Sequence, residues 1–199
     1  MYLFTLVSCD VRIDPLDSPV GCSMFDVIKK YGYPAEKHFV TTEDGYILQL
    51  FRIPYIHKKP VAVLHHGLGC TSRDWVLLGP NKSLGYLLAD EGYDVWLSNF
   101  RGSFYSRNHT YLSIKSKQFW DFSWHEIGIY DAPAIFNYII NTTGVESHYH
   151  VGYSMGATVL FVLASMKPEY NKNIRLLVAQ GPPVFFNGQQ SAIFTPTTQ

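Results

Sequence analysis

The sequence predicts an α/β fold with a doubly wound sheet, and three observations support this. Strand-like apolar runs alternate along the chain with longer helical runs, as such a fold requires. Residues 61–65 form a continuous apolar run, which is typical of a parallel strand buried on both faces. A Gly-x-Ser-x-Gly motif at 152–156 stands where a short strand passes into an apolar helix.

The first half of the chain predicts a hairpin, a buried strand and a helix. Strands at 39–42 and 46–53 flank Asp44-Gly45, a dipeptide that favours a tight turn. The buried strand 61–65 comes next. A helix over 83–90 follows it and is closed near a glycine.

The second half predicts two further strand and helix pairs and a last strand. A strand over 94–99 precedes a helix that runs from Asp131 to about residue 141. Because Asp131 stands just before a proline, we interpret its carboxylate as a helix cap, structural rather than catalytic. The remaining elements are a strand over 148–151, a helix over 157–166 and a sixth strand over 175–180.

The motif around Ser154 predicts a nucleophile held on a sharp turn. Such a turn crowds the backbone, so it needs small neighbours, which Gly152 and Gly156 provide. The serine oxygen is then lifted above the sheet edge. The first helical amide, that of Met155, points toward the reacting carbonyl group.

A second backbone donor is predicted in the loop that follows the strand 61–65. That strand leads into His66-Gly67-Leu68-Gly69, and the Leu68 amide is the candidate donor. Two such amides stabilise the negative charge of a tetrahedral intermediate. The alternative is that both glycines only serve the turn. A dinucleotide-binding loop is excluded because Ser72 stands where that motif needs its third glycine.

An ordered series of segments resembles the N-terminal half of the acid lipase family, which includes gastric and lysosomal acid lipases and insect relatives. The resemblance covers about residues 22–185, so it is more specific than a pentapeptide. It implies the α/β-hydrolase fold. The segments are residues 31–34, 40–48, 52–54, 66–68, 94–102, Ser106, His109, 119–126, 130–133 and 152–156.

The resemblance implies a lipid carboxylic-ester hydrolase that acts on triacylglycerols or steryl esters and needs no cofactor. Ser154 is then the nucleophile, and Leu68 and Met155 are the oxyanion donors. The family typically has His before the serine and Gln after it, where this chain has Tyr153 and Met155. An oxyanion donor acts through its backbone, so Met155 is compatible with that role, whereas Tyr153 alters the pocket wall.

The usual partners of a catalytic serine do not follow Ser154. In this fold the acid and the histidine come later in the chain, but all eight histidines here precede the serine. We therefore expect the chain to stop after about the sixth strand, without the cap and the last strands. An upstream base is a remaining alternative, since a triad is defined by geometry. Its candidates are His109, His125, His148 and His150.

Two functions consequently remain open. The first is the lipid hydrolase, with very weak turnover by the chain as it stands, because a serine without a base is a poor nucleophile. The second is a catalytically inactive homologue that acts as a lipid-binding or decoy protein. A proline iminopeptidase or thioesterase would share the elbow but does not explain the segment 99–109.

The N-terminal residues contain no recognisable signal peptide, and the glycosylation motifs have meaning only if the protein enters the secretory route. Residues 1–21 are interpreted as a leader or degraded signal segment, and 22–199 as a partial hydrolase domain. Acceptor patterns for N-linked glycans begin at Asn81, Asn108 and Asn141. The resemblance likewise implies a secreted or lysosomal glycoprotein.

Composition excludes several other classes of function. The chain has 16 basic and 16 acidic residues and no Lys/Arg run, so nucleic acid is not an expected partner. Neutral lipids or esters, at a lipid-droplet or micelle surface, are compatible partners. No apolar run is long enough to span a bilayer. The pairs His65-His66 and His148-x-His150 lack clustered carboxylates or thiols, so no metal site is expected.

Overall fold

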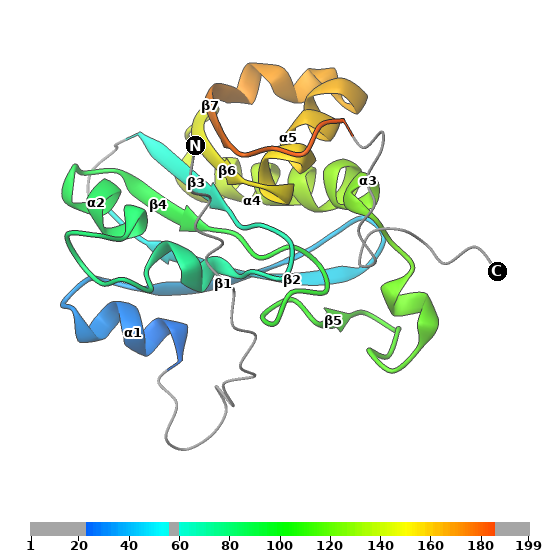
Figure 1. The fold of residues 1–199 in the computed structure, drawn as a ribbon, viewed down its shortest axis with the longest axis horizontal. Coiled ribbons are helices and arrows are strands. Elements are labelled where there is room, and N and C mark those ends of the chain that lie inside the picture. The colour runs from blue at the N-terminus through cyan, green and yellow to red at the C-terminus, as the bar shows by residue number, and fades with distance from the viewer. Residues whose placement is uncertain (1–22, 56–59, 186–199) are drawn as a thin grey trace, which may run out of the picture.

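The computed structural model describes residues 23–55 and 60–185, and its centre is one seven-stranded mixed sheet (Figure 1). The strand order is β1-β2-β4-β3-β6-β7, and the short β5 pairs with β2. The strands are β1 (Glu36–Thr41), β2 (Tyr46–Ile53), β3 (Val61–His65), β4 (Asp94–Leu97), β5 (Asn108–His109), β6 (His148–Tyr153) and β7 (Ile174–Gln180).

The strand directions bring several loops to one edge of the sheet. β3 runs parallel to both β4 and β6, and β6 runs parallel to β7. β2 is antiparallel to β1, β4 and β5. The carboxyl ends of the four parallel strands therefore meet at the same edge, where ligands bind in open α/β sheets.

Helices cover both faces of this sheet, as a doubly wound fold requires (Figure 1). α1 (Met24–Lys30) and α2 (Leu84–Asp90) pack on one face. α4 (Ala132–Thr143) and α5 (Met155–Met166) pack on the other. The shorter pieces are α3 (Trp124–Glu126), the 3₁₀ helices η1 (Ser72–Trp75), η2 (Lys117–Trp120) and η4 (Pro168–Asn173), and the π-helix η3 (Ile127–Asp131).

The central strands separate two hydrophobic clusters. Successive side chains of a strand point to opposite faces, so Trp96 of β4 joins the cluster beneath α4 and α5. Its neighbours Val95 and Leu97 join the cluster beneath α1 and α2. All five residues of β3 are buried, which explains the uninterrupted apolar run in the sequence.

The structure confirms the predicted α/β class and most of its elements. β2 and β3 have the predicted bounds, and the turn between β1 and β2 has Gly45 at φ 97°, a conformation that favours glycine. The helix predicted from residue 157 begins two residues earlier, at Met155. α1 and β5 were not predicted.

The interpretation of Asp131 as a helix cap is wrong. Its side chain makes no capping hydrogen bond, because helical backbone precedes it in η3 and continues through it into α4. The carboxylate instead accepts from the Arg101 backbone amide at 2.8 Å and from Arg101 Nε at 2.6 Å. Its role is still structural, since this buried pair fastens the loop after β4 to η3.

The Arg101 guanidinium, besides its bond to Asp131, also contacts Asp44 and Tyr46. Its two terminal nitrogens donate to the Asp44 carboxylate at 2.6 and 2.8 Å. The Tyr46 ring centroid lies 3.9 Å from the guanidinium carbon. Burial raises the pKa of Asp131 to about 6, and the charge of Arg101 limits that rise.

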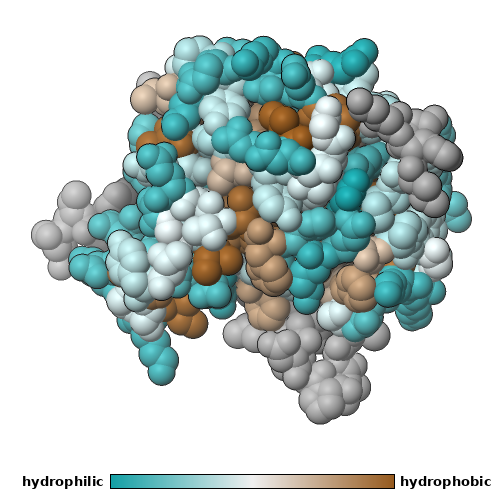
Figure 2. Space-filling view, turned by 180° about the vertical axis from the view of Figure 1, so that it is seen from behind, coloured by the Kyte–Doolittle hydropathy of each residue, from teal (hydrophilic) through white to brown (hydrophobic). Residues whose placement is uncertain are grey.

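The surface is mixed in character. On the face shown in Figure 2, brown apolar areas are small and are separated by teal polar side chains. Within residues 23–55 and 60–185, no helix has the length and apolar character needed to cross a membrane.

Candidate active site

Ser154 lies at the junction of β6 and α5, at the carboxyl edge of the parallel strands (Figure 1). Its backbone has φ 50° and ψ −121°, and a positive φ is uncommon for a residue with a side chain. Such strain costs about 1–3 kcal/mol and persists only where the surroundings enforce it. The nucleophile candidate is therefore held by its neighbours rather than by its own conformational preference.

Two glycines leave room for this turn. A Cβ on Gly156 would lie 2.5 Å from the His65 carbonyl oxygen and 2.7 Å from that of His66. A Cβ on Gly152 would lie 2.6 Å from the Ala157 backbone. Both contacts are with backbone, which cannot move aside cheaply, so any larger residue would push the helix away from the strands.

The end of β7 also holds the turn in place. The Ser154 amide donates to the Gln180 carbonyl at 2.8 Å. One helical turn later, Thr158 Oγ1 donates to the Pro183 carbonyl at 2.9 Å. The elbow is therefore fixed from both sides, by the loop after β3 and by the chain leaving β7.

The two candidate oxyanion donors lie on the two segments that meet at Ser154. A Cβ on Gly67 would lie 3.3 Å from the Ser154 Cβ, so the loop carrying Leu68 is in contact with the serine. The Leu68 amide makes no backbone hydrogen bond to any described residue. The Met155 amide is at the first helical position, where it has no intrahelical acceptor. Both amides are thus available to an incoming oxygen.

The buried side chain of His66 positions this loop. Its Nε2 accepts from the Phe100 amide at 3.1 Å, so the proton of the neutral ring is on Nδ1, which donates to the Gly67 carbonyl at 2.8 Å. Burial lowers the pKa of His66, although the bond to Gly67 opposes that change. The neutral ring joins the loop after β3 to the loop after β4.

Asn99 is a second positioning residue, which no sequence motif singles out. Its Oδ1 accepts from the Ser72 amide at 2.9 Å, and its Nδ2 donates to Ser72 Oγ and to the Gln49 carbonyl. One buried amide side chain thereby connects three segments at the carboxyl edge. A polar residue that ends an apolar strand is the only sequence signal that points to it.

Three buried groups form a hydrogen-bonded row below the elbow. The hydroxyl of Ser98 donates to the Leu64 carbonyl, and His65 Nδ1 lies 2.9 Å from that hydroxyl. His65 Nε2 lies 3.1 Å from His150 Nδ1. Because the Ser98 proton is already used, His65 donates from Nδ1 and accepts at Nε2 from His150. His150 Nε2 is then an unprotonated acceptor, and it is buried without a described partner.

Burial keeps this row neutral. It lowers the pKa of His65 to about 3, and the neighbouring His66 and His148 contribute to the decrease. Burial also lowers the pKa of His150 well below its usual range. Buried and half-buried side chains alternate over residues 148–151, as in a strand. The histidines lie on the buried face, and Tyr149 and Val151 lie on the half-buried face.

Three of the four candidate upstream bases, His109, His148 and His150, have other partners or lie in the core. No hydrogen bond among residues 23–55 and 60–185 joins a histidine ring to the Ser154 side chain. His109 Nε2 donates to the Asp44 carbonyl, and its Nδ1 accepts from two backbone amides. His148 and His150 lie in the core beneath α4.

Tyr153, which replaces the histidine typical of the family, lies beside the oxyanion loop. Its ring atoms are 2.9 and 3.1 Å from where a Gly67 Cβ would be. The side chain is 48% exposed. The ring is therefore exposed next to Ser154. It leaves no room for a side chain at position 67, where the chain has glycine.

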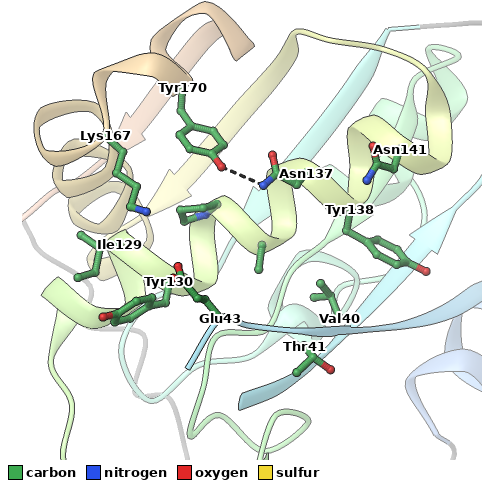
Figure 3. Close-up of a pocket in the computed structure, with 12 residues that line it drawn as sticks. Val40, Thr41, Glu43, Ile129, Tyr130, Asn137, Tyr138, Asn141, Lys167 and Tyr170 are labelled. Atoms are coloured by element: carbon green, nitrogen blue, oxygen red, sulfur yellow. Dashed lines mark hydrogen bonds between the residues drawn. The ribbon is translucent and has the colours of Figure 1, made fainter. Parts of the chain in front are cut away.

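The other predicted site residues lie apart from Ser154. The side chains of Asn81, Asn108 and Asn141 are exposed. Asn141 lines an open groove of about 340 Å³ beside α4, where Lys167 and Glu43 are further lining residues (Figure 3). None of the candidate catalytic residues lines this groove. The described part of the chain contains no group of three or more His, Cys, Asp or Glu residues placed to hold a metal ion.

Comparison with known proteins agrees with the fold. Residues 60–195 match the family described as "alpha/beta hydrolase fold", and residues 24–79 match the "partial alpha/beta-hydrolase lipase region". The chain thus belongs to the α/β-hydrolases, the class that the sheet and the strand–serine–helix turn define. Within that class it is a member of the acid lipase family.

Three relatives illustrate this membership. The chain is 50% identical over 163 residues to "Lipase 1" of Drosophila melanogaster, covering 82% of this chain and 37% of that protein. It is 43% identical to human "Lysosomal acid lipase/cholesteryl ester hydrolase", with coverages of 86% and 45%. For human "Lipase member K" the identity is 44%, with coverages of 100% and 51%. The chain therefore spans about half the length of these relatives or less.

A solved structure supports the fold alone. An esterase from Pyrococcus furiosus superimposes with a TM-score of 0.60 at 24% identity, over 79% of this chain and 56% of that one. At that identity the similarity shows the architecture and not the chemistry.

Proposed function

We propose that this chain carries the nucleophile half of a lipid carboxylic-ester hydrolase that acts on triacylglycerols or steryl esters. Ser154 is the nucleophile, and the amides of Leu68 and Met155 form the oxyanion hole. The observation that supports this most strongly is the strained backbone of Ser154, at φ 50° and enclosed by Gly152 and Gly156. Strain of this kind is concentrated at functional sites.

The proposed chemistry has two steps. Ser154 Oγ adds to the ester carbonyl as its proton passes to a base, and the two amides bind the resulting oxyanion. The alcohol then leaves with that proton, which gives an acyl-serine. Water adds to the acyl-serine in the same way and releases the fatty acid and the serine hydroxyl.

Covalent labelling tests the nucleophile directly. A fluorophosphonate probe forms a bond from Ser154 Oγ to phosphorus, while fluoride leaves and the serine proton passes to solvent. We expect slow labelling of the parent chain, none of Ser154→Ala, and unchanged labelling of Ser113→Ala, which alters an exposed hydroxyl elsewhere. Equal labelling of the parent chain and Ser154→Ala would contradict the assignment.

The second candidate function is a non-catalytic lipid-binding or decoy protein. It is favoured by one observation: none of the histidines in the described residues is hydrogen bonded to Ser154. An ether analogue of a triacylglycerol, which cannot be hydrolysed, separates the two functions. Tight binding of the analogue, together with no turnover of a soluble ester, would support the decoy; turnover lost in Ser154→Ala supports the hydrolase.

We further propose that the protein follows the secretory route as a glycoprotein, with residues 1–21 as a leader and 22–199 as the partial hydrolase domain. Relatives named for the lysosome and the stomach support this localisation. Residues 1–21 lie outside the described part of the chain. Glycans are expected on the exposed Asn81, Asn108 and Asn141. Enzymatic deglycosylation followed by peptide mass mapping tests each asparagine, because release converts it to aspartate.

A further inference from the structure

An exposed cluster of apolar and cationic side chains lies on the segment between β4 and α3. Phe104, Ile114 and Trp120 are 37%, 45% and 45% exposed. They contrast with Phe119 on the same segment, which is buried in the core beneath α4 and α5. The segment therefore contributes Phe119 to the core and leaves three other large apolar side chains exposed to solvent.

Specific contacts bring these side chains together. The Arg107 guanidinium lies 6.0 Å from the Phe104 ring centroid and 5.8 Å from that of Trp120. The indole Nε1 of Trp120 donates to the Ile114 carbonyl at 2.7 Å. We call Phe104, Arg107, Ile114 and Trp120 the aromatic cluster; its members belong to one segment, 104–120, and contact one another in space.

Within this segment, residues 102–120 carry charges of one sign, and an exposed aspartate, Asp121, follows them. Between Gly102 and Trp120 there is no aspartate or glutamate, whereas Arg107, Lys115 and Lys117 are all exposed. The whole chain has a formal net charge of zero, so this is a local excess. Tryptophan is favoured where lipid meets water, and each cation near an anionic lipid surface adds about 1 kcal/mol.

The position of the cluster relates it to Ser154. The segment begins at the carboxyl end of β4, and Ser154 follows the carboxyl end of β6. Both strands are parallel to β3, so the two ends lie at the same edge of the sheet. The buried pair of Arg101 with Asp131 fixes the start of the segment. The cluster is therefore carried on an anchored loop and not on a free one.

We propose that the aromatic cluster, with Lys115 and Lys117, is a docking surface for aggregated anionic lipid, and that docking turns the Ser154 edge of the sheet toward the lipid. Trp120 and Ile114 enter the interfacial layer, and the cations bind headgroups. The choice of lipid as partner rests on the proposed function, whereas the preference for anionic lipid rests on the charges of the segment.

Vesicle sedimentation tests the charge component. The full chain with Ser154→Ala, which cannot turn over lipid, is mixed with phosphatidylcholine vesicles with and without phosphatidylglycerol. Tight binding is expected only to the mixture, and Lys115→Glu with Lys117→Glu should weaken it at least about 30-fold. The matched control is Lys29→Glu with Lys30→Glu, an equal change of charge on α1, and it should bind like the parent.

A second pair tests the apolar component. Ile114→Ser should weaken binding to the mixed vesicles, whereas Met166→Ser, at the far end of α5 and 56% exposed, should not. Circular dichroism shows whether each variant is folded. Binding that is unchanged in the Lys115/Lys117 and Ile114 variants, or equally weakened in the controls, overturns the proposal. A dimer that these variants convert to a monomer, without any effect on lipid, also overturns it.

Fluorophosphonate labelling separates this proposal from the proposed function. For labelling, the docking substitutions are made in the chain that keeps Ser154. Substitutions that abolish vesicle binding but leave the label at Ser154 unchanged support the docking surface. A parent chain that binds anionic vesicles but gives no Ser154-specific label would contradict the hydrolase while leaving the docking surface supported.

Discussion

Acid should destabilise this fold through His65, and the size of the effect can be worked from its surroundings. The ring is enclosed between Phe100 and His150, with Ser98 and His150 as its hydrogen-bond partners. Burial lowers its pKa to about 3, against about 6.5 for an exposed histidine. The folded state thus excludes a proton that the unfolded chain binds below about pH 6.5.

The sign and the magnitude follow from linkage. Stability is lost as the pH falls below about 6.5, at about 1.4 kcal/mol per pH unit, and the loss levels off near pH 3. Between pH 6.5 and 4.5, His65 should therefore remove about 2 kcal/mol of unfolding free energy, because the unfolded ring is already half protonated at pH 6.5. His65→Gln keeps a polar, neutral side chain that does not titrate, so the variant should lose about 2 kcal/mol less over the same interval.

Urea unfolding at the two pH values measures this difference. The compared quantity is the fall in unfolding free energy between the two pH values. Any packing cost of the substitution is the same at both pH values and therefore cancels. Tyr46→Phe is the control, because it removes no group that titrates below pH 7. Between pH 6.5 and 4.5 its free energy of unfolding should fall by as much as that of the parent chain. Equal losses in the parent chain and His65→Gln would refute a neutral, buried His65.

Three further predictions concern the elbow and its anchor. Gly156→Ala should destabilise by about 1–3 kcal/mol and abolish fluorophosphonate labelling, because the clash of its Cβ with backbone at 2.5 Å outweighs a gain in helix propensity of about 1 kcal/mol. At pH 7.5, Arg101→Met should cost about 3 kcal/mol in urea unfolding, since the fully buried Asp131 carboxylate loses its cation; a loss below about 1 kcal/mol would contradict this. Tyr46→Phe should cost only about 1 kcal/mol in the same assay, because it removes one donor from the Phe119 carbonyl.

The sequence predicted the elements whose signal is local. The uninterrupted apolar run of β3 and the Asp44-Gly45 turn need no knowledge of distant residues, and both are confirmed. The motif at Ser154 likewise predicts a strand, a turn and a helix. These predictions succeed because periodicity and turn chemistry are properties of neighbouring residues.

What the sequence did not reveal depends on long-range partners. Asp131 has the local pattern of a helix cap, but Arg101, thirty residues earlier, takes its carboxylate. The role of Asn99 depends on Ser72 and Gln49, which no spacing rule connects. Side-chain pairing between distant segments is decided by packing, and packing is not visible in a single sequence.

The hydrogen bonds from Ser154 to Gln180 and from Thr158 to Pro183 have a consequence for the order in which the protein is made. A ribosome adds about 5 to 20 residues per second, so Gln180 joins the chain about 1 to 5 seconds after Ser154. During that interval the turn can pack against the loop after β3, but the Ser154 amide lacks its acceptor on Gln180. The turn at Ser154 is therefore expected to be among the last parts of this chain to reach its final shape during synthesis.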